Sequence, residues 1–104
     1  MPMSLQFVIK PLPGSDLLKI IESAKVSAKL WKKHGATDVT LWAVTAGEVG
    51  NMAFTVQFEN FTSYGASYDK LSADPEFRKW QSDVAKLGMT EWVSGNVARA
   101  VPLD

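Results

Sequence analysis

The stretch DVTLWAVTAGEVGNMAFTVQFE, residues 38–59, decides the fold. Residues 38–46 are rich in β-branched and apolar side chains, and residues 51–59 alternate apolar with polar ones. Both patterns are typical of β-strands, and a short segment bounded by glycines, Gly47–Gly50, is typical of a hairpin loop. Residues 38–59 therefore predict two antiparallel strands joined by a four-residue loop.

A four-residue loop sets Ala46 opposite Asn51 and thereby assigns every side chain of the hairpin to a face. Trp42 then shares a mixed face with Thr55 and Gln57. A loop of three or five residues would exchange the faces of one strand. We prefer four because the other face is then wholly apolar, with Val39, Leu41, Ala43, Phe54, Val56 and Phe58.

Upstream of the hairpin, the alternation over residues 4–10 predicts a strand. Apolar residues at helical spacing then predict a helix from about Asp16 to about His34. Ser15 or Asp16 can cap its first turn, and Gly35 follows its end.

Downstream of the hairpin, aromatic and apolar residues over 61–71 predict a helix. The sequence Asp74-Pro75-Glu76-Phe77 then combines a capping residue, a proline for the first turn and an acidic side chain, which is a strong helix start. The second helical region is therefore predicted as two pieces with a break near residues 72–74, and Gly88 ends the second piece.

Residues 90–101 predict a final strand, in which Gly95 is the candidate for a β-bulge. The order strand, helix, strand, strand, helix, strand is that of the ferredoxin-like βαββαβ unit. Its helices cover one face of an antiparallel sheet and leave the other face open. We therefore predict an α+β, ferredoxin-like fold in a single domain that spans residues 1–104.

The stretch ENFTSYGASYDKLSADPEF, residues 59–77, resembles NIPSNAP-like domains and related dimeric α+β barrel families. In those families the third strand runs into a helix, then a D-P-x-F step, then a second helix. The resemblance spans about Leu30 to Pro102. It implies the dimeric α+β barrel and a homodimer, and it points to no particular reaction.

The open face of the predicted sheet supplies a second reason for a homodimer. It would carry the apolar side chains of Val8, Trp42, Val44, Ala53 and Trp92. Exposing each of the larger ones forgoes about 1.5–3 kcal/mol, and soluble monomers rarely show such contiguous patches. A two-fold partner would cover both open faces at once.

The same open face is predicted to hold a ligand site, because aromatic and polar side chains mix there as they do in many binding sites. The ligand is expected to be a small hydrophobic or aromatic molecule. Trp31 and Trp80 lie on the apolar stripes of their helices and are predicted to be core. The predicted site residues are Gln6, Val8, Trp42, Thr55, Gln57 and Trp92.

The amino-acid composition argues against several classes of partner and site. The formal net charge is zero, so neither nucleic acid nor an anionic membrane is expected as a partner. The absence of cysteine excludes disulfides and thiolate metal sites and fits a reducing cytoplasm, where we expect the protein. No secretory signal or membrane helix is expected from the sequence.

No catalytic residue, metal ligand or cofactor is assigned. The only histidine, His34, sits at the end of the first helix, where a cap or a solvated side chain is expected. Haem-degrading relatives of the fold rely on an Asn, a Trp and a His around the barrel. This chain has Gln6 in its first strand, no Trp in its third strand and no His in its second helical region, so haem degradation is not expected.

Three functions remain open from the sequence. The preferred one is a small-molecule-binding, NIPSNAP-like dimeric α+β barrel of uncharacterised function. The first alternative is a cofactor-independent monooxygenase of the antibiotic-biosynthesis type, which would orient an electron-rich aromatic substrate for oxygen. The second alternative is a structural or interaction module whose barrel is filled by side chains.

Overall fold

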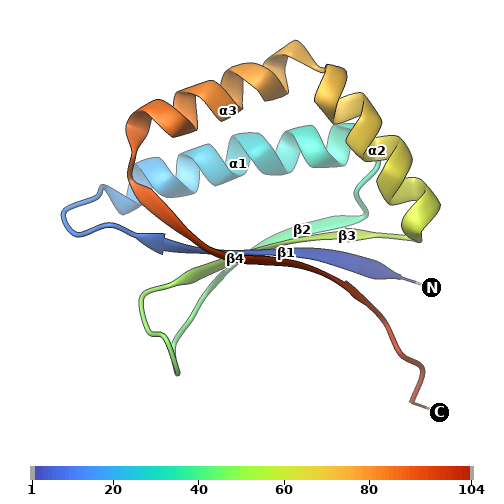
Figure 1. Ribbon diagram of the computed structural model, residues 1–104, viewed down its shortest axis with the longest axis horizontal. Helices are drawn as coiled ribbons and strands as arrows, with labels where there is room; N and C mark the ends of the chain where they lie inside the picture. The colour runs from blue at the N-terminus through green and yellow to red at the C-terminus, as the bar shows by residue number, and fades with distance from the viewer. Residues whose placement is uncertain (1, 104) are drawn as a thin grey trace.

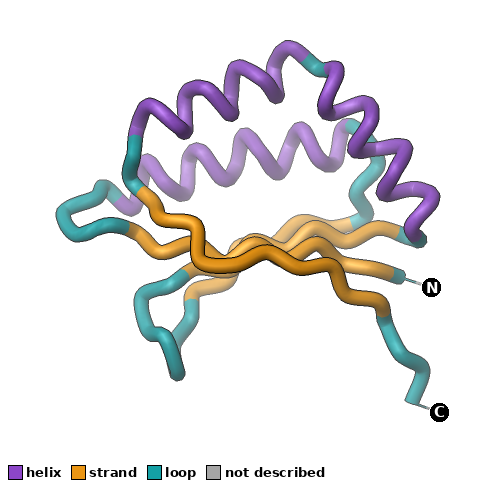
Figure 2. Tube along the Cα trace, in the orientation of Figure 1, coloured by secondary structure: helices purple, strands orange, loops and turns teal. Residues whose placement is uncertain are grey.

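The computed structural model describes residues 2–103, and within them three helices lie on one face of a four-stranded antiparallel sheet (Figures 1 and 2). The strand order in the sheet is β2-β3-β1-β4. The predicted ferredoxin-like α+β fold is thus confirmed. In chain order the elements are β1 (Met3–Pro11), α1 (Leu17–Lys33), β2 (Asp38–Ala43), β3 (Met52–Phe58), α2 (Phe61–Ala73), α3 (Pro75–Leu87) and β4 (Thr90–Arg99).

Each helix begins at a side-chain cap that is recognisable in the sequence. The carboxylate of Asp16, the amide oxygen of Asn60 and the carboxylate of Asp74 accept a backbone N–H of the first turn at 3.0, 2.8 and 2.9 Å. Asp74 separates α2 from α3, as predicted, and Pro75 is the first residue of α3. Gly88 ends α3 with a φ of 58°, a left-handed conformation that glycine adopts without strain.

The hairpin differs from its prediction by two residues. Ala43 pairs with Met52, so the connection is residues 44–51 and the predicted four-residue loop is wrong. Within this connection the backbone N–H of Val44 donates to the carbonyl oxygen of Asn51 at 3.0 Å, and the side-chain amide of buried Asn51 donates to the carboxylate of Glu48 at 2.9 Å. A shift of two residues keeps every side chain on its face, so the predicted faces are correct.

The buried core lies at the end of the sheet where α2 descends (Figure 1). Trp31 of α1 packs edge-to-face on Phe58 of β3, with ring centroids 5.8 Å apart, and is core as predicted. By contrast, none of the residues of α3, Pro75–Leu87, is buried. No helix in the described range 2–103 is long and apolar enough to cross a membrane. The buried core consists of Met3, Leu5, Leu30, Trp31, Val56, Phe58 and Leu71.

Candidate ligand-binding site

A cavity of about 640 Å³ lies between the sheet and the helices α1 and α3. Its floor comes from β1, β2 and β3, its roof mainly from α1 and α3, and its rim from β4 and from two tyrosines of α2. It therefore occupies the helical face of the sheet, on the side away from the predicted ligand site.

The floor of the cavity is aromatic. Phe7 of β1 pairs with Phe54 of β3, and both side chains face the helices together with Leu41 of β2. All three are only half-buried, although side chains farther along β1 and β3 are fully buried. The floor is exposed because no helical side chain descends to cover it.

The roof is held in place by Trp80 of α3. Its indole N–H donates to the carbonyl oxygen of Ser23 at 2.8 Å and to the Ser23 hydroxyl at 3.1 Å, which ties α3 to α1. The ring also stacks on Phe77 of the same helix, with centroids 5.6 Å apart. Trp80 was predicted as core, and the structure shows it half-buried, packed against the core and lining the cavity.

The rim of the cavity includes Trp92, and here the sequence prediction is wrong. The ladder between β1 and β4 pairs Val8 with Ser94 but Ile9 with Trp92, so a β-bulge adds one residue to β4 at this point. The extra residue rotates Trp92 from the open face to the helical face. Its ring lies 5.3 Å from that of Phe7, centroid to centroid.

Gly95 allows this position of the Trp92 ring. A Cβ on Gly95 would lie 2.6 Å from Cζ2 of Trp92 and 3.5 Å from Cδ1 of Phe7. Gly95 was predicted to form the bulge itself, but the register shifts beside it, between Val8 and Ile9 of the partner strand. The glycine instead provides the space into which the indole fits.

The cavity lining is uncharged. Among the described residues 2–103, those that line it include no Asp, Glu, Lys, Arg or His. The lining is dominated by aromatic and aliphatic side chains, which favour an apolar ligand. The polar residues of the lining are Ser23, Ser27, Tyr64, Tyr68, Gln81, Thr90 and Asn96.

The other predicted site residues lie together on the open face, and none of them lines this cavity. Trp42 is 56% exposed and faces away from the helices, as predicted. Its indole N–H donates to the Thr55 hydroxyl at 2.9 Å. Gln6 pairs with Thr55 between β1 and β3. Val8 and Gln57 belong to neighbouring pairs of the same ladder and lie on the same face.

The sequence contained a signal for the cavity that our prediction missed. On the face of α1 that lines the cavity, Ser23, Ala24 and Ser27 are all small. Small side chains opposite the large rings of Phe77 and Trp80 leave unfilled volume between layers. An apolar stripe was interpreted as core only, because a stripe does not show how closely the layers approach.

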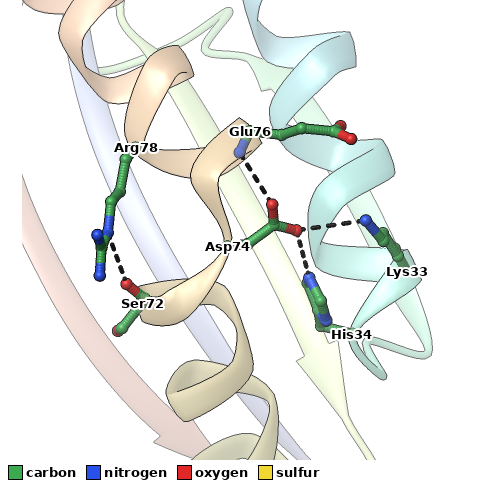
Figure 3. Close-up of polar contacts among 6 residues, drawn as sticks. All are labelled: Lys33, His34, Ser72, Asp74, Glu76 and Arg78. Atoms are coloured by element: carbon green, nitrogen blue, oxygen red, sulfur yellow. Dashed lines mark hydrogen bonds and ion pairs between the residues drawn. The ribbon is translucent and has the colours of Figure 1, made fainter.

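His34 takes part in a polar cluster outside the cavity (Figure 3). Its Nε2 lies 2.7 Å from Oδ2 of Asp74, and Nζ of Lys33 lies 3.4 Å from the same oxygen. The other carboxylate oxygen accepts the backbone N–H of Glu76. These contacts lower the pKa of Asp74 to about 2. The largest cause is the hydrogen bond from His34, and the next largest is the backbone N–H of Glu76.

This cluster joins the end of α1 to the start of α3. His34 terminates α1, as predicted, but its side chain is largely buried against Asp74 rather than solvated. Beside it, the Arg78 side chain donates to the carbonyl oxygen of Ser72 across the break between α2 and α3. Residues 2–103 contain no group of three or more His, Cys, Asp or Glu side chains that could hold a metal ion.

Comparison with known proteins places the fold. No protein-family model matches the chain, and no curated protein matches it in sequence. Among solved structures, protein Atu4242 from Agrobacterium tumefaciens is 13% identical, with a TM-score of 0.72 over 99% of this chain and 96% of that one. A second structure of Atu4242 describes it as a NIPSNAP family protein with unknown function.

Two further structures extend the comparison. An uncharacterised NIPSNAP domain protein from Burkholderia xenovorans is 14% identical, with a TM-score of 0.69 over all of this chain and 98% of that one. SnoaB, a cofactor-independent oxygenase from Streptomyces nogalater, is 8% identical, with a TM-score of 0.73 over 97% of this chain and 94% of that one.

These similarities define the fold class of the chain. It has the ferredoxin-like α+β fold that the NIPSNAP proteins and SnoaB share. The predicted resemblance to NIPSNAP-like proteins is confirmed at the level of the fold. At identities of 8–14% the likeness shows the fold alone.

Proposed function

We propose that this protein binds a small, uncharged, largely aromatic molecule in the cavity between the sheet and the helices α1 and α3. The observation that carries the proposal is the lining: about 640 Å³ of space bounded by aromatic rings and by no charged side chain. This volume lies within the range of small-molecule sites, about 300–1,000 Å³.

The energetics favour such a ligand. Phe7, Phe54 and Trp92 keep exposed ring surface, and covering apolar surface gains about 25 cal/mol per Å². A charged ligand would lose its hydration without gaining a counter-charge from the lining, so it is disfavoured. Tyrosine, serine and amide groups supply the few polar contacts that would orient a neutral molecule.

A matched pair of substitutions on α1 tests the site. Ala24 lines the cavity, whereas Val26 on the same helix is exposed and does not line it. We expect Ala24→Trp to fill the cavity and weaken binding of the neutral fluorescent probe N-phenyl-1-naphthylamine at least about tenfold, since it removes most of the buried contact area. Val26→Trp should bind like the wild type.

Native mass spectrometry of the freshly purified protein would show whether a ligand co-purifies. Failure of the wild type to bind the probe, together with no co-purified molecule, would contradict the proposal. Equal binding by Ala24→Trp and Val26→Trp would place the probe elsewhere. Either result would favour a structural or interaction module.

A second candidate is a cofactor-independent monooxygenase. The observation that favours it is the shared fold with SnoaB together with a cavity that suits an electron-rich aromatic substrate. Such a reaction on 1-naphthol would consume one O₂ and yield 1,4-naphthoquinone and one water. Oxygen uptake with formation of the quinone, absent from Ala24→Trp and from protein-free controls, would support this activity.

We also propose that the protein forms a homodimer through the open face of the sheet. The support is the exposed Trp42 beside the half-buried Val8 and Val44. Light scattering coupled to size exclusion should give twice the mass of one chain, and Trp42→Arg should lower it. A wild-type mass near the 11.4 kDa of one chain would refute the dimer.

A cytoplasmic location without nucleic-acid or membrane partners completes the proposal. The zero net charge and the cysteine-free sequence support it. Cell fractionation tests the location. A gel-shift assay and vesicle sedimentation, both at low salt, test the partners, and tight binding in either would overturn this part.

A further inference from the structure

One polar group stands out within the apolar cavity. Ser27 of α1 is 2% exposed and lines the cavity, and no side-chain hydrogen bond joins its hydroxyl to another residue of the described range 2–103. Unlike the hydroxyl of Ser67, it is not a fully enclosed polar atom without a partner. Buried polar groups are nearly always hydrogen-bonded, and a buried hydroxyl without a partner is costly. A ligand that fills the cavity would remove water from the Ser27 hydroxyl, so the ligand itself has to supply the partner.

Ser23 lies one helical turn before Ser27, and side chains four residues apart share a face of a helix. The Ser23 hydroxyl accepts from the indole N–H of Trp80, which leaves its own proton free to donate. The roof of the cavity thus presents two hydroxyls at adjacent turns, with the ring of Trp80 fixed beside them.

We propose that the Ser27 hydroxyl is the hydrogen-bonding anchor of the site, and that the ligand is a neutral aromatic molecule with a hydroxyl or carbonyl oxygen on the edge that faces α1. This inference rests on the proposed function and adds the ligand's chemical class to it. A ligand oxygen satisfies Ser27, whereas a pure hydrocarbon leaves the hydroxyl unpaired and buried. A carboxylate is disfavoured, since the lining holds no positive charge to pair with it.

A second buried serine provides the matched control. Ser67 of α2 is fully buried, and its hydroxyl also has no partner, but Ser67 does not line the cavity. Ser27→Ala and Ser67→Ala therefore remove the same group from equally buried helical positions, and only the first faces the ligand. Both substitutions favour helix formation, so both variants are expected to fold.

The test measures binding of 2-naphthol, naphthalene and 2-naphthoate by equilibrium dialysis at pH 7. We expect Ser27→Ala to weaken 2-naphthol about two- to tenfold, which corresponds to one net hydrogen bond. Its affinity for naphthalene should stay unchanged or rise. Ser67→Ala should bind both probes like the wild type, Ser27→Thr should retain 2-naphthol, and 2-naphthoate should bind more weakly than 2-naphthol throughout.

The outcomes separate this inference from the proposed function. If Ser27→Ala weakens both neutral probes equally, Ser27 only shapes the cavity and the inference is wrong. If it leaves 2-naphthol unchanged while Ala24→Trp abolishes binding, the ligand site stands but its anchor is not Ser27. If the wild type binds neither neutral probe nor N-phenyl-1-naphthylamine, the proposed function and this inference both fail.

Discussion

The two ends of the helical face of the sheet are built differently. At one end, α2 descends to β3 (Figure 1). There the side chains of Phe58, Leu71 and Trp31 belong to the buried core. At the other end, α3 packs mainly on α1, and the space beneath it is the cavity. The same sheet face thus borders a packed core at one end and a cavity at the other.

The difference teaches that residue type alone does not set the role of an aromatic side chain. Trp31 is 4% exposed and belongs to the core, whereas Trp92 is 61% exposed at the cavity rim. Both side chains point into the space between the sheet and the helices. What distinguishes them is whether other side chains fill the space around them, so stability should depend on the packed end and ligand binding on the end with the cavity.

The largest expected effect compares truncations at the two ends. Phe58→Ala removes a ring that contacts Trp31 and Tyr64, and it should lower the free energy of unfolding by about 3–5 kcal/mol. Leu87→Ala, at the open end of α3, should cost under about 1 kcal/mol because Leu87 is half-exposed. Urea unfolding followed by circular dichroism measures both, and equal losses would contradict the division.

A second, smaller effect concerns the joint between the two ends, where Asp74 caps α3 and bonds His34. The folded-state pKa of Asp74 is about 2, below its ordinary value of 3.8, so folding favours the ionised form. The stability that Asp74 contributes is therefore complete above about pH 4 and is lost as the pH falls toward 2.

Asp74→Asn isolates this contribution, since asparagine still caps a helix but carries no charge. The variant should be less stable than the wild type at pH 7, and the gap should close as the pH falls from 4 to 2. Thermal melts across this range measure it. Asp16→Asn, at a cap without the histidine partner, is the control and should show a smaller gap. A gap that stays constant with pH would show that the charge of Asp74 does not stabilise the fold.

Much of the fold could be predicted from the sequence, because its signals are local. The caps at Asp74 and Gly88 mark the limits of α3, and alternation marks the strands. The side chains of the hairpin were assigned to the correct faces although the predicted loop length was wrong, because the register differed by two residues. Local patterns therefore carried the architecture even where one connection was wrong.

The cavity and the face of Trp92 were not predicted, for two physical reasons. The bulge in β4 depends on pairing with β1, a partner far away in sequence, so the change of face at Trp92 has no local signature. The cavity depends on how far α3 stands from the sheet, which a helical stripe does not specify. The spacing of apolar residues along an element indicates the face on which a side chain lies. Only the tertiary packing shows whether another side chain contacts it there.

The smallest expected effect on stability tests the rim. Gly95→Ala would place a Cβ against the Trp92 ring, which can swing outward because it is already largely exposed. Displacing the ring loses its contact with Phe7, while replacing a strand glycine with alanine gains about 0.5–1 kcal/mol. The net change in the free energy of unfolding should stay within about 1 kcal/mol.

A double-mutant cycle with Trp92→Ala separates these terms. In the wild-type background, Gly95→Ala should weaken binding of N-phenyl-1-naphthylamine, since the indole leaves the rim of the cavity. In the Trp92→Ala background no ring remains to be displaced, so the same substitution should stabilise the protein and leave binding unchanged. Equal effects in both backgrounds would mean that Gly95 does not act through Trp92, and that the open end of the helical face is not shaped by this contact.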